Sequence, residues 1–149
     1  MNEDACNHEH HDHAHNDLET HLFEMWEGKI SKEDFLRLFL MSDLFILVDG
    51  EPAGNTLGDR KPMVISASID APKMIAVFSS PERASRMIAQ FPEYNFPIRV
   101  DTNWVLHCIG ATMGVAFNPG WEMGFEIAPE GALQLRQALD AAMTQAGEV

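Results

Sequence analysis

The chain of 149 residues is long enough for one domain with a substantial core, and its hydrophobic fraction of 46% is ordinary for a globular protein. The formal net charge of −13 argues against nucleic acid and anionic membranes as partners, because both require clustered lysine and arginine. The two cysteines, Cys6 and Cys108, do not form a disulfide framework. No apolar stretch reaches the roughly 18 residues of a membrane span. Since the acidic N-terminus also lacks the apolar segment of a signal peptide, we expect a cytoplasmic protein.

The N-terminal segment contains almost nothing that a core would bury. We expect residues 1–16 to be a disordered, acidic, His-rich tail and residues 17–149 to form a single domain. Five imidazoles and two carboxylates within eight residues of this tail can supply a complete ligand shell to Zn²⁺ or Ni²⁺. The alternative is a solvated tail without a physiological ligand; the domain itself requires no cofactor. The candidate metal ligands are His8, His10, His11, His13 and His15.

A pair of helices is predicted directly after the tail. Apolar residues at helical spacing predict a first helix from Asp17, a plausible N-cap, to Gly28. Ser31 then caps a second helix, in which residues 35–41 are apolar on nearly all sides. Burial of this segment in a large core is one interpretation, and an interface such as a homodimer is the alternative.

Three strands are predicted next. The apolar run Leu44–Val48 is typical of a central strand, and Met63–Ile69 and Lys73–Ser79 form an antiparallel hairpin. Ser80 and Pro81 occupy the N-cap and first position of the following helix. The remaining elements are a strand Phe96–Val100, a helix capped by Asp101 or Thr102 and running to Ala111, strands Gly114–Phe117 and Gly124–Ile127, and a helix from Pro129 to about Gln145.

The order of these elements is α-α-β-β-β-α-β-α-β-β-α. Strands and helices mixed in this way predict an α+β (mixed α/β) fold. We expect a small mixed sheet of about five strands, with helices packed on it and the helical pair at its N-terminal end.

The turn between the last two strands is the best candidate for an interaction surface. Proline cannot donate to a sheet ladder and glycine tolerates positive φ, so Asn118, Pro119 and Gly120 predict a tight turn. Trp121 follows, and an aromatic residue on a surface loop is typical of recognition sites. The alternative is a purely structural turn with Trp121 folded over the sheet edge.

Two further groups of residues suggest catalysis but have simpler interpretations. His107 and Cys108 are sequence neighbours, and neighbours on a helix point in different directions. We therefore expect His107 near the surface and Cys108 buried as a small hydrophobe. Glu122, Glu126 and Glu130 lack a partnering base, so we expect a solvated face rather than an acid–base pair. No motif converges on an enzyme.

Three blocks of the sequence resemble the SseB-like N-terminal domain, a bacterial family named for the enhanced serine sensitivity protein. The blocks are Ser42–Gly50 (SDLFILVDG), Met74–Arg86 (MIAVFSSPERASR) and Gly114–Gly120 (GVAFNPG), and the third is the most specific. With their linking elements they cover about residues 18–145. The aromatic Trp121 and the His-rich tail depart from the family pattern.

The resemblance implies a mixed α/β domain and supplies no catalytic residues to carry over. We therefore expect a non-enzymatic module of this family that acts by protein–protein contact, with a protein partner or a second copy of the chain. The alternative is a metal-handling protein, in which the His-rich tail captures an ion and the domain directs it.

Overall fold

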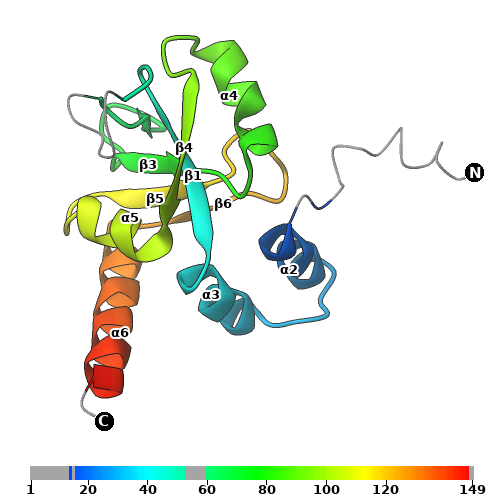
Figure 1. The fold of residues 1–149 in the computed structure, drawn as a ribbon, viewed down its shortest axis with the longest axis vertical. Helices are drawn as coiled ribbons and strands as arrows, with labels where there is room; N and C mark the ends of the chain where they lie inside the picture. Colours follow the sequence, from blue (N-terminus) through cyan, green and yellow to red (C-terminus); the bar gives the residue numbers. More distant parts are fainter. Residues whose placement is uncertain (1–13, 15, 53–59, 148–149) are drawn as a thin grey trace, which may run out of the picture.

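The computed structural model of the chain describes residue 14, residues 16–52 and residues 60–147 (Figure 1). Within these ranges the elements follow the predicted order, with one short 3-10 helix, η2, placed ahead of α4. The elements are α2 (Asp17–Trp26), α3 (Lys32–Leu40), β1 (Asp43–Val48), β2 (Val64–Ile65), β3 (Met74–Val77), η2 (Pro81–Ala84), α4 (Ser85–Gln90), β4 (Phe96–Asp101), α5 (Thr102–Cys108), β5 (Gly114–Phe117), β6 (Phe125–Ile127) and α6 (Pro129–Gly147).

The described strands form two sheets, and helices pack against them, which confirms the α+β class. The larger sheet has the order β2-β3-β5-β6; β3 and β5 run parallel, whereas its other neighbours are antiparallel. The strand β1, predicted to be central, pairs along one edge with β4, and its other edge meets residues beside β3 and β2 through the isolated bridges Phe45–Phe78 and Val48–Pro62. The single expected sheet is therefore divided at β1.

Aromatic side chains from α3 and the last two strands fill the main core. Phe35 and Phe39 of α3 are fully buried, and their rings contact those of Phe117 and Phe125 at centroid distances of 5.3–6.3 Å. Burial of this kind stabilises each large side chain by roughly 1.5–3 kcal/mol. The core interpretation of α3 is thus confirmed for both phenylalanines, whereas Met41 at its C-terminal end is 83% exposed.

Helix caps agree with the sequence except at two positions. Ser31 and Asp101 cap α3 and α5, because their side chains accept from the amides of Asp34 and Trp104. The first cap lies one residue earlier than predicted: Asn16, not Asp17, accepts from the amide of Glu19. Ser80 stands at the N-cap position of η2, but its buried hydroxyl makes no hydrogen bond within the described part of the chain.

One predicted burial and one predicted strand boundary are wrong. Cys108 is exposed, because the buried face of α5 carries Thr102, Val105 and Leu106, and the residue two positions beyond Leu106 lies on another side of the helix. Partial burial still raises the pKa of the Cys108 thiol. Ile69 is 98% exposed, since β2 ends at Ile65 and the alternating pattern continues into a loop.

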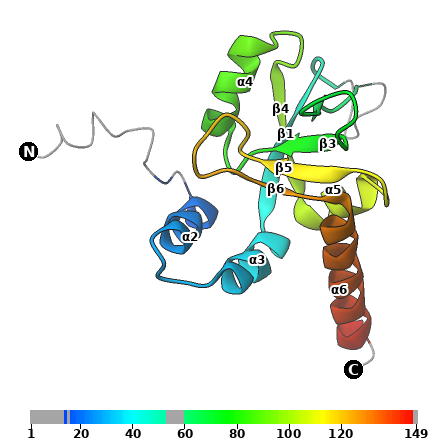
Figure 2. The ribbon, with the colours of Figure 1, turned by 180° about the vertical axis from the view of Figure 1, so that it is seen from behind.

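Helices α2 and α4 and the connection between β5 and β6 lie on the same side of the molecule (Figures 1 and 2). Figure 1 shows α4 at one end and α6 extending from the other, with α2 and α3 beside the end of β1. Seen from behind in Figure 2, the connection between β5 and β6 again lies between α4 and α2. In the described ranges, no helix combines the length and hydropathy needed to cross a bilayer.

Candidate binding pocket

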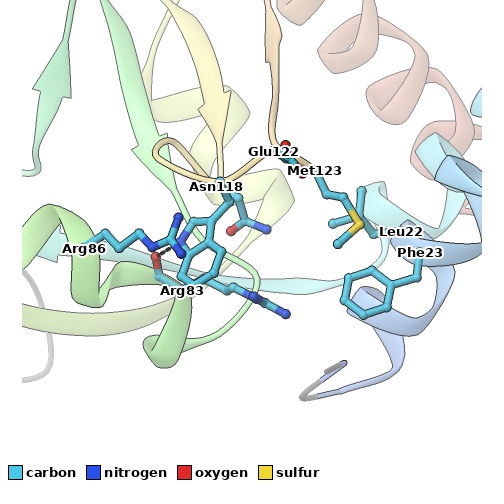
Figure 3. Close-up of a pocket in the computed structure, with 8 residues that line it drawn as sticks. Leu22, Phe23, Arg83, Arg86, Asn118, Glu122 and Met123 are labelled. Carbon is cyan, nitrogen blue, oxygen red and sulfur yellow. Dashed lines mark hydrogen bonds between the residues drawn. The ribbon is translucent and has the colours of Figure 1, made fainter. Parts of the chain in front are cut away.

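A pocket of about 320 Å³ opens between α2, the η2–α4 segment and the connection from β5 to β6 (Figure 3). One part of its wall carries guanidinium and aromatic groups, and another part is apolar. This size lies at the lower end of the range for small-ligand sites, roughly 300–1,000 Å³. The lining residues are Leu22, Phe23, Arg83, Arg86, Asn118, Trp121, Glu122 and Met123.

A buried ion pair joins two of the elements that form the pocket. The Arg83 Nε and Nη2 atoms donate to the two carboxylate oxygens of Glu19, each at 3.2 Å. Glu19 is 0% exposed and Arg83 is 3% exposed. Because a buried charge deprived of its partner is strongly unfavourable, this pair fixes α2 against η2 in one position.

Hydrogen bonds extend the ion pair to the β5–β6 turn. The Ser79 hydroxyl donates to Glu19, and the side-chain amide of Asn118 donates to the same hydroxyl at 3.0 Å. The side-chain Oδ1 of Asn118 accepts from the Ser79 backbone N–H at 2.9 Å, and the Asn16 side-chain amide donates to the Ser79 backbone carbonyl at 2.7 Å. Asn118 has a φ of 52°, a left-handed conformation that asparagine tolerates better than most residues. The turn is thus anchored to the base of α2.

The second arginine is held over the indole ring at the edge of the pocket. The Arg86 guanidinium carbon lies 3.6 Å from the Trp121 ring centroid, and its Nη1 donates to the Gly120 carbonyl at 2.8 Å. The indole N–H itself donates to the Arg83 carbonyl at 2.8 Å. Stacking and hydrogen bonding together restrict the rotamers of Arg86 although its side chain is exposed.

The apolar part of the wall comes from α2 and the β5–β6 connection. Leu22 is 1% exposed and belongs to the core, whereas Phe23 and Met123 are half-buried. Figure 3 shows the Met123 side chain directed toward Leu22 and Phe23, on the opposite side of the view from Arg86. A ligand in this pocket would therefore meet apolar side chains at one end and a guanidinium at the other.

The four turn residues predicted as an interaction surface have different environments. Asn118 is buried in the network described above, and Pro119 is half-buried. Gly120 is exposed with a φ of 92°, and Trp121 is half-buried with its indole N–H bonded. Asn118 and Trp121 line the pocket. The turn therefore has a structural role, and its role in recognition stays a prediction.

The other candidate residues are accounted for separately. The five tail histidines lie outside the described residues, so their metal binding stays a prediction. In the described part, no three metal-ligating side chains gather at one place. His107 is exposed, as predicted, and its Nε2 lies 3.1 Å from the Asp140 Oδ1. The three glutamates of the carboxylate set, Glu122, Glu126 and Glu130, are exposed, as expected for a solvated face.

The sequence reasoning missed the residues that organise the pocket. The sequence patterns single out neither Glu19 nor Arg83, and Arg86 enters only as the last residue of the block Met74–Arg86. The available signal was weak: Glu19 stands next to Leu18 and three residues before Leu22, so it adjoins the buried stripe of α2. Its partner lies 64 residues further along the chain, which no local pattern indicates.

Comparison with known families agrees with the three resembling blocks. The model of the SseB protein N-terminal domain matches residues 19–132. The chain belongs to this family. The matched range of the SseB domain contains Glu19, Arg83, Arg86 and Trp121, so the whole pocket lies within it. No curated protein and no solved structure matches the chain.

Proposed function

We propose that this SseB-family chain is a non-enzymatic interaction module that receives a segment of a partner protein in the pocket beside Trp121. The observation that carries the proposal is the division of the wall into an apolar part and a held, exposed guanidinium. Hot spots of protein interfaces combine these chemistries, since tryptophan, tyrosine and arginine dominate them.

The chemistry of the lining groups supports binding rather than catalysis. The exposed guanidinium of Arg86 can orient a ligand through its N–H donors, whereas Arg83 is engaged by Glu19. Asn118 is already engaged with Ser79. The lining carboxylate Glu122 is exposed to solvent, an environment that gives it no special reactivity.

The buried network beneath the pocket favours tight recognition. Association costs free energy for every group that must be ordered on binding, and groups that are already ordered avoid this cost. Glu19, Arg83, Ser79 and Asn118 hold both walls in place before any ligand arrives.

A peptide-display selection on the full chain tests the proposal. The bait is the wild-type protein, and the enriched sequences are then measured against the Met123→Gln variant without any prior counter-selection. Met41→Gln is the matched control, because Met41 is exposed and does not line the pocket. We expect a consensus sequence that binds the wild type and the Met41 variant but loses about tenfold in affinity with the Met123 variant. Failure to enrich any consensus, or equal binding to all three proteins, would overturn the proposal.

Metal handling is the second candidate function, and the histidine cluster of the tail favours it. A histidine cluster binds ions through whichever imidazoles are deprotonated, so we propose an affinity that falls as histidine becomes protonated. Delivery of an ion to the partner bound in the pocket would join the two candidate functions. The calorimetric titration described in the Discussion tests this candidate independently of the pocket.

A further inference from the structure

We infer that the pocket recognises an acidic–apolar segment of a partner protein, with an aspartate or glutamate carboxylate on Arg86 and a neighbouring bulky apolar side chain against Phe23 and Met123. This inference rests on the proposed function and specifies which side chains of the partner segment the pocket binds. It commits to a side-chain carboxylate within a peptide.

Arg86 is the group that calls for an anion. Three arginines of the described chain have carboxylate partners, Arg83 with Glu19, Arg37 with Asp34 and Arg99 with Asp43, and Arg60 and Arg136 do not line the pocket. Within the same ranges, Arg86 has no carboxylate within 4.0 Å, and its one protein hydrogen bond, to the Gly120 carbonyl, occupies a single N–H. Its remaining N–H donors are exposed and fit the two oxygens of a carboxylate.

The surroundings of Arg86 make it an effective receptor. Because it is stacked on Trp121, less side-chain entropy is lost when an anion binds than for a freely rotating arginine. The Trp121 ring covers one face of the Arg86 guanidinium and limits the access of water to that side of an ion pair, which strengthens the interaction relative to an open surface.

The apolar part of the wall defines the second element of the ligand. Phe23 and Met123 are half-buried in the free chain, so a bulky side chain placed on them would remove further apolar surface from water. A pocket of about 320 Å³ accommodates one or two side chains rather than a folded domain. A methionine in the wall also adapts to side chains of different shape.

Charge favours a carboxylate over phosphate-rich ligands. The chain carries a formal net charge of −13, which repels polyanions, and Glu122 adds a negative group to the wall itself. A single carboxylate beside an apolar group meets less repulsion. Chain termini are commonly captured by backbone N–H groups, whereas the receptor here is a side-chain guanidinium at an exposed edge, which favours an internal acidic residue.

The test is a charge-neutralisation cycle between the protein and a peptide from the selection above. Affinities are measured by calorimetry for the wild type, Arg86→Gln and the control Arg37→Gln, which removes an equally exposed charge outside the pocket. Each protein is titrated with the acidic peptide and with its Asp→Asn or Glu→Gln form. We expect Arg86→Gln to lower the affinity for the acidic peptide by about tenfold to a hundredfold and to leave the affinity for the amide peptide nearly unchanged.

The Arg37 variant should bind both peptides like the wild type, and Arg86→Lys should recover part of the affinity because it keeps the charge without the planar fork. Equal losses for both peptides would overturn the inference, as would a consensus without any acidic residue. Both results leave the proposed function intact, because a peptide still binds at the Met123 wall.

Two further comparisons test whether the pocket is occupied by the chain's own tail or by the C-terminus of a peptide. The chain's own acidic tail is neutralised in the full-length protein by Glu3→Gln, Asp4→Asn, Glu9→Gln and Asp12→Asn. If this change strengthens peptide binding about tenfold or more, the tail itself is the occupant and the inference fails. If a peptide binds only with its C-terminal carboxylate free, a chain terminus is the ligand and the inference also fails.

Discussion

Glu19 and Arg83 form the contact on which the geometry of the pocket depends, and a double-mutant cycle measures their coupling. The variants are Glu19→Met, Arg83→Met and the double mutant, because methionine fills a similar volume without charge. Each single change removes one charge from beside another that is almost inaccessible to solvent, with exposed fractions of 0% for Glu19 and 3% for Arg83.

The expected magnitudes follow from this burial. Removing one member of a buried ion pair costs about 3–5 kcal/mol, because the other charge stays desolvated. Removing both charges eliminates that penalty, and the Ser79 hydroxyl keeps its hydrogen bond from Asn118. We therefore expect the double mutant to lose less stability than either single mutant, so that the sum of the two single losses exceeds the double loss by more than about 3 kcal/mol.

Urea unfolding followed by circular dichroism gives the free energies of unfolding, with a stabilising osmolyte present in all samples so that the single mutants fold. Glu24→Met is the control, since Glu24 lies on the same helix and is only half-buried. Additive losses, equal within about 0.5 kcal/mol, would show that the two residues act independently and would refute the reasoning.

Further predictions concern the turn, the thiol and the tail. Asn118→Ala should cost about 2–4 kcal/mol in urea unfolding, and Asn118→Gly less, because both lose the acceptor for the Ser79 amide but glycine tolerates a φ of 52°; equal losses would contradict this reasoning. Gly124→Ala should lower the melting temperature strongly, because a Cβ atom would lie 2.5 Å from the backbone carbonyl oxygen of Asn118. An unchanged melting temperature would show that Gly124 does not pack this closely against Asn118. In a Cys6→Ser background, Cys108 should react with iodoacetamide more slowly than a model thiol at pH 8 and faster as pH rises, since its pKa is raised; reaction as fast as the model thiol would contradict the effect of burial. Calorimetric titration of Zn²⁺ or Ni²⁺ into the full chain should show integral binding that a full-length variant with glutamine at the five tail histidines lacks; identical titrations would remove the metal-handling candidate.

Local features of the fold are predictable because they depend on residues close in sequence. The caps at Ser31 and Asp101 involve amides three residues away, and the turn after β5 follows from the properties of proline and glycine. The element order follows from hydrophobic periodicity in the same way. Cys108 shows the limit of reading apolar runs, since Leu106 and Ile109 of the same run are buried but Cys108 lies on the exposed side of α5.

Features that depend on distant residues could not be derived from one sequence. Strand pairing is an example, because the run that forms β1 looks equally suitable for the centre of one sheet or for a separate pair with β4. The contact between Glu19 and Arg83 is another, since charged residues are normally solvated and each alone suggests a surface position. The sequence therefore predicted only the β5–β6 turn as a candidate site. The parts of the pocket wall that come from α2 and from the η2–α4 segment are evident only in the folded chain.

Methyl-resolved NMR of the full chain with the selected peptide tests the central claim most directly. The account predicts that peptide addition shifts the methyl signals of Met123 and Leu22, which lie in the pocket wall, and the indole N–H signal of Trp121. The exposed Met41 and the indole of Trp104 should stay unchanged, because neither lines the pocket. Shifts at the Trp104 indole or the Met41 methyl, with the pocket signals unmoved, would place binding elsewhere and contradict the account.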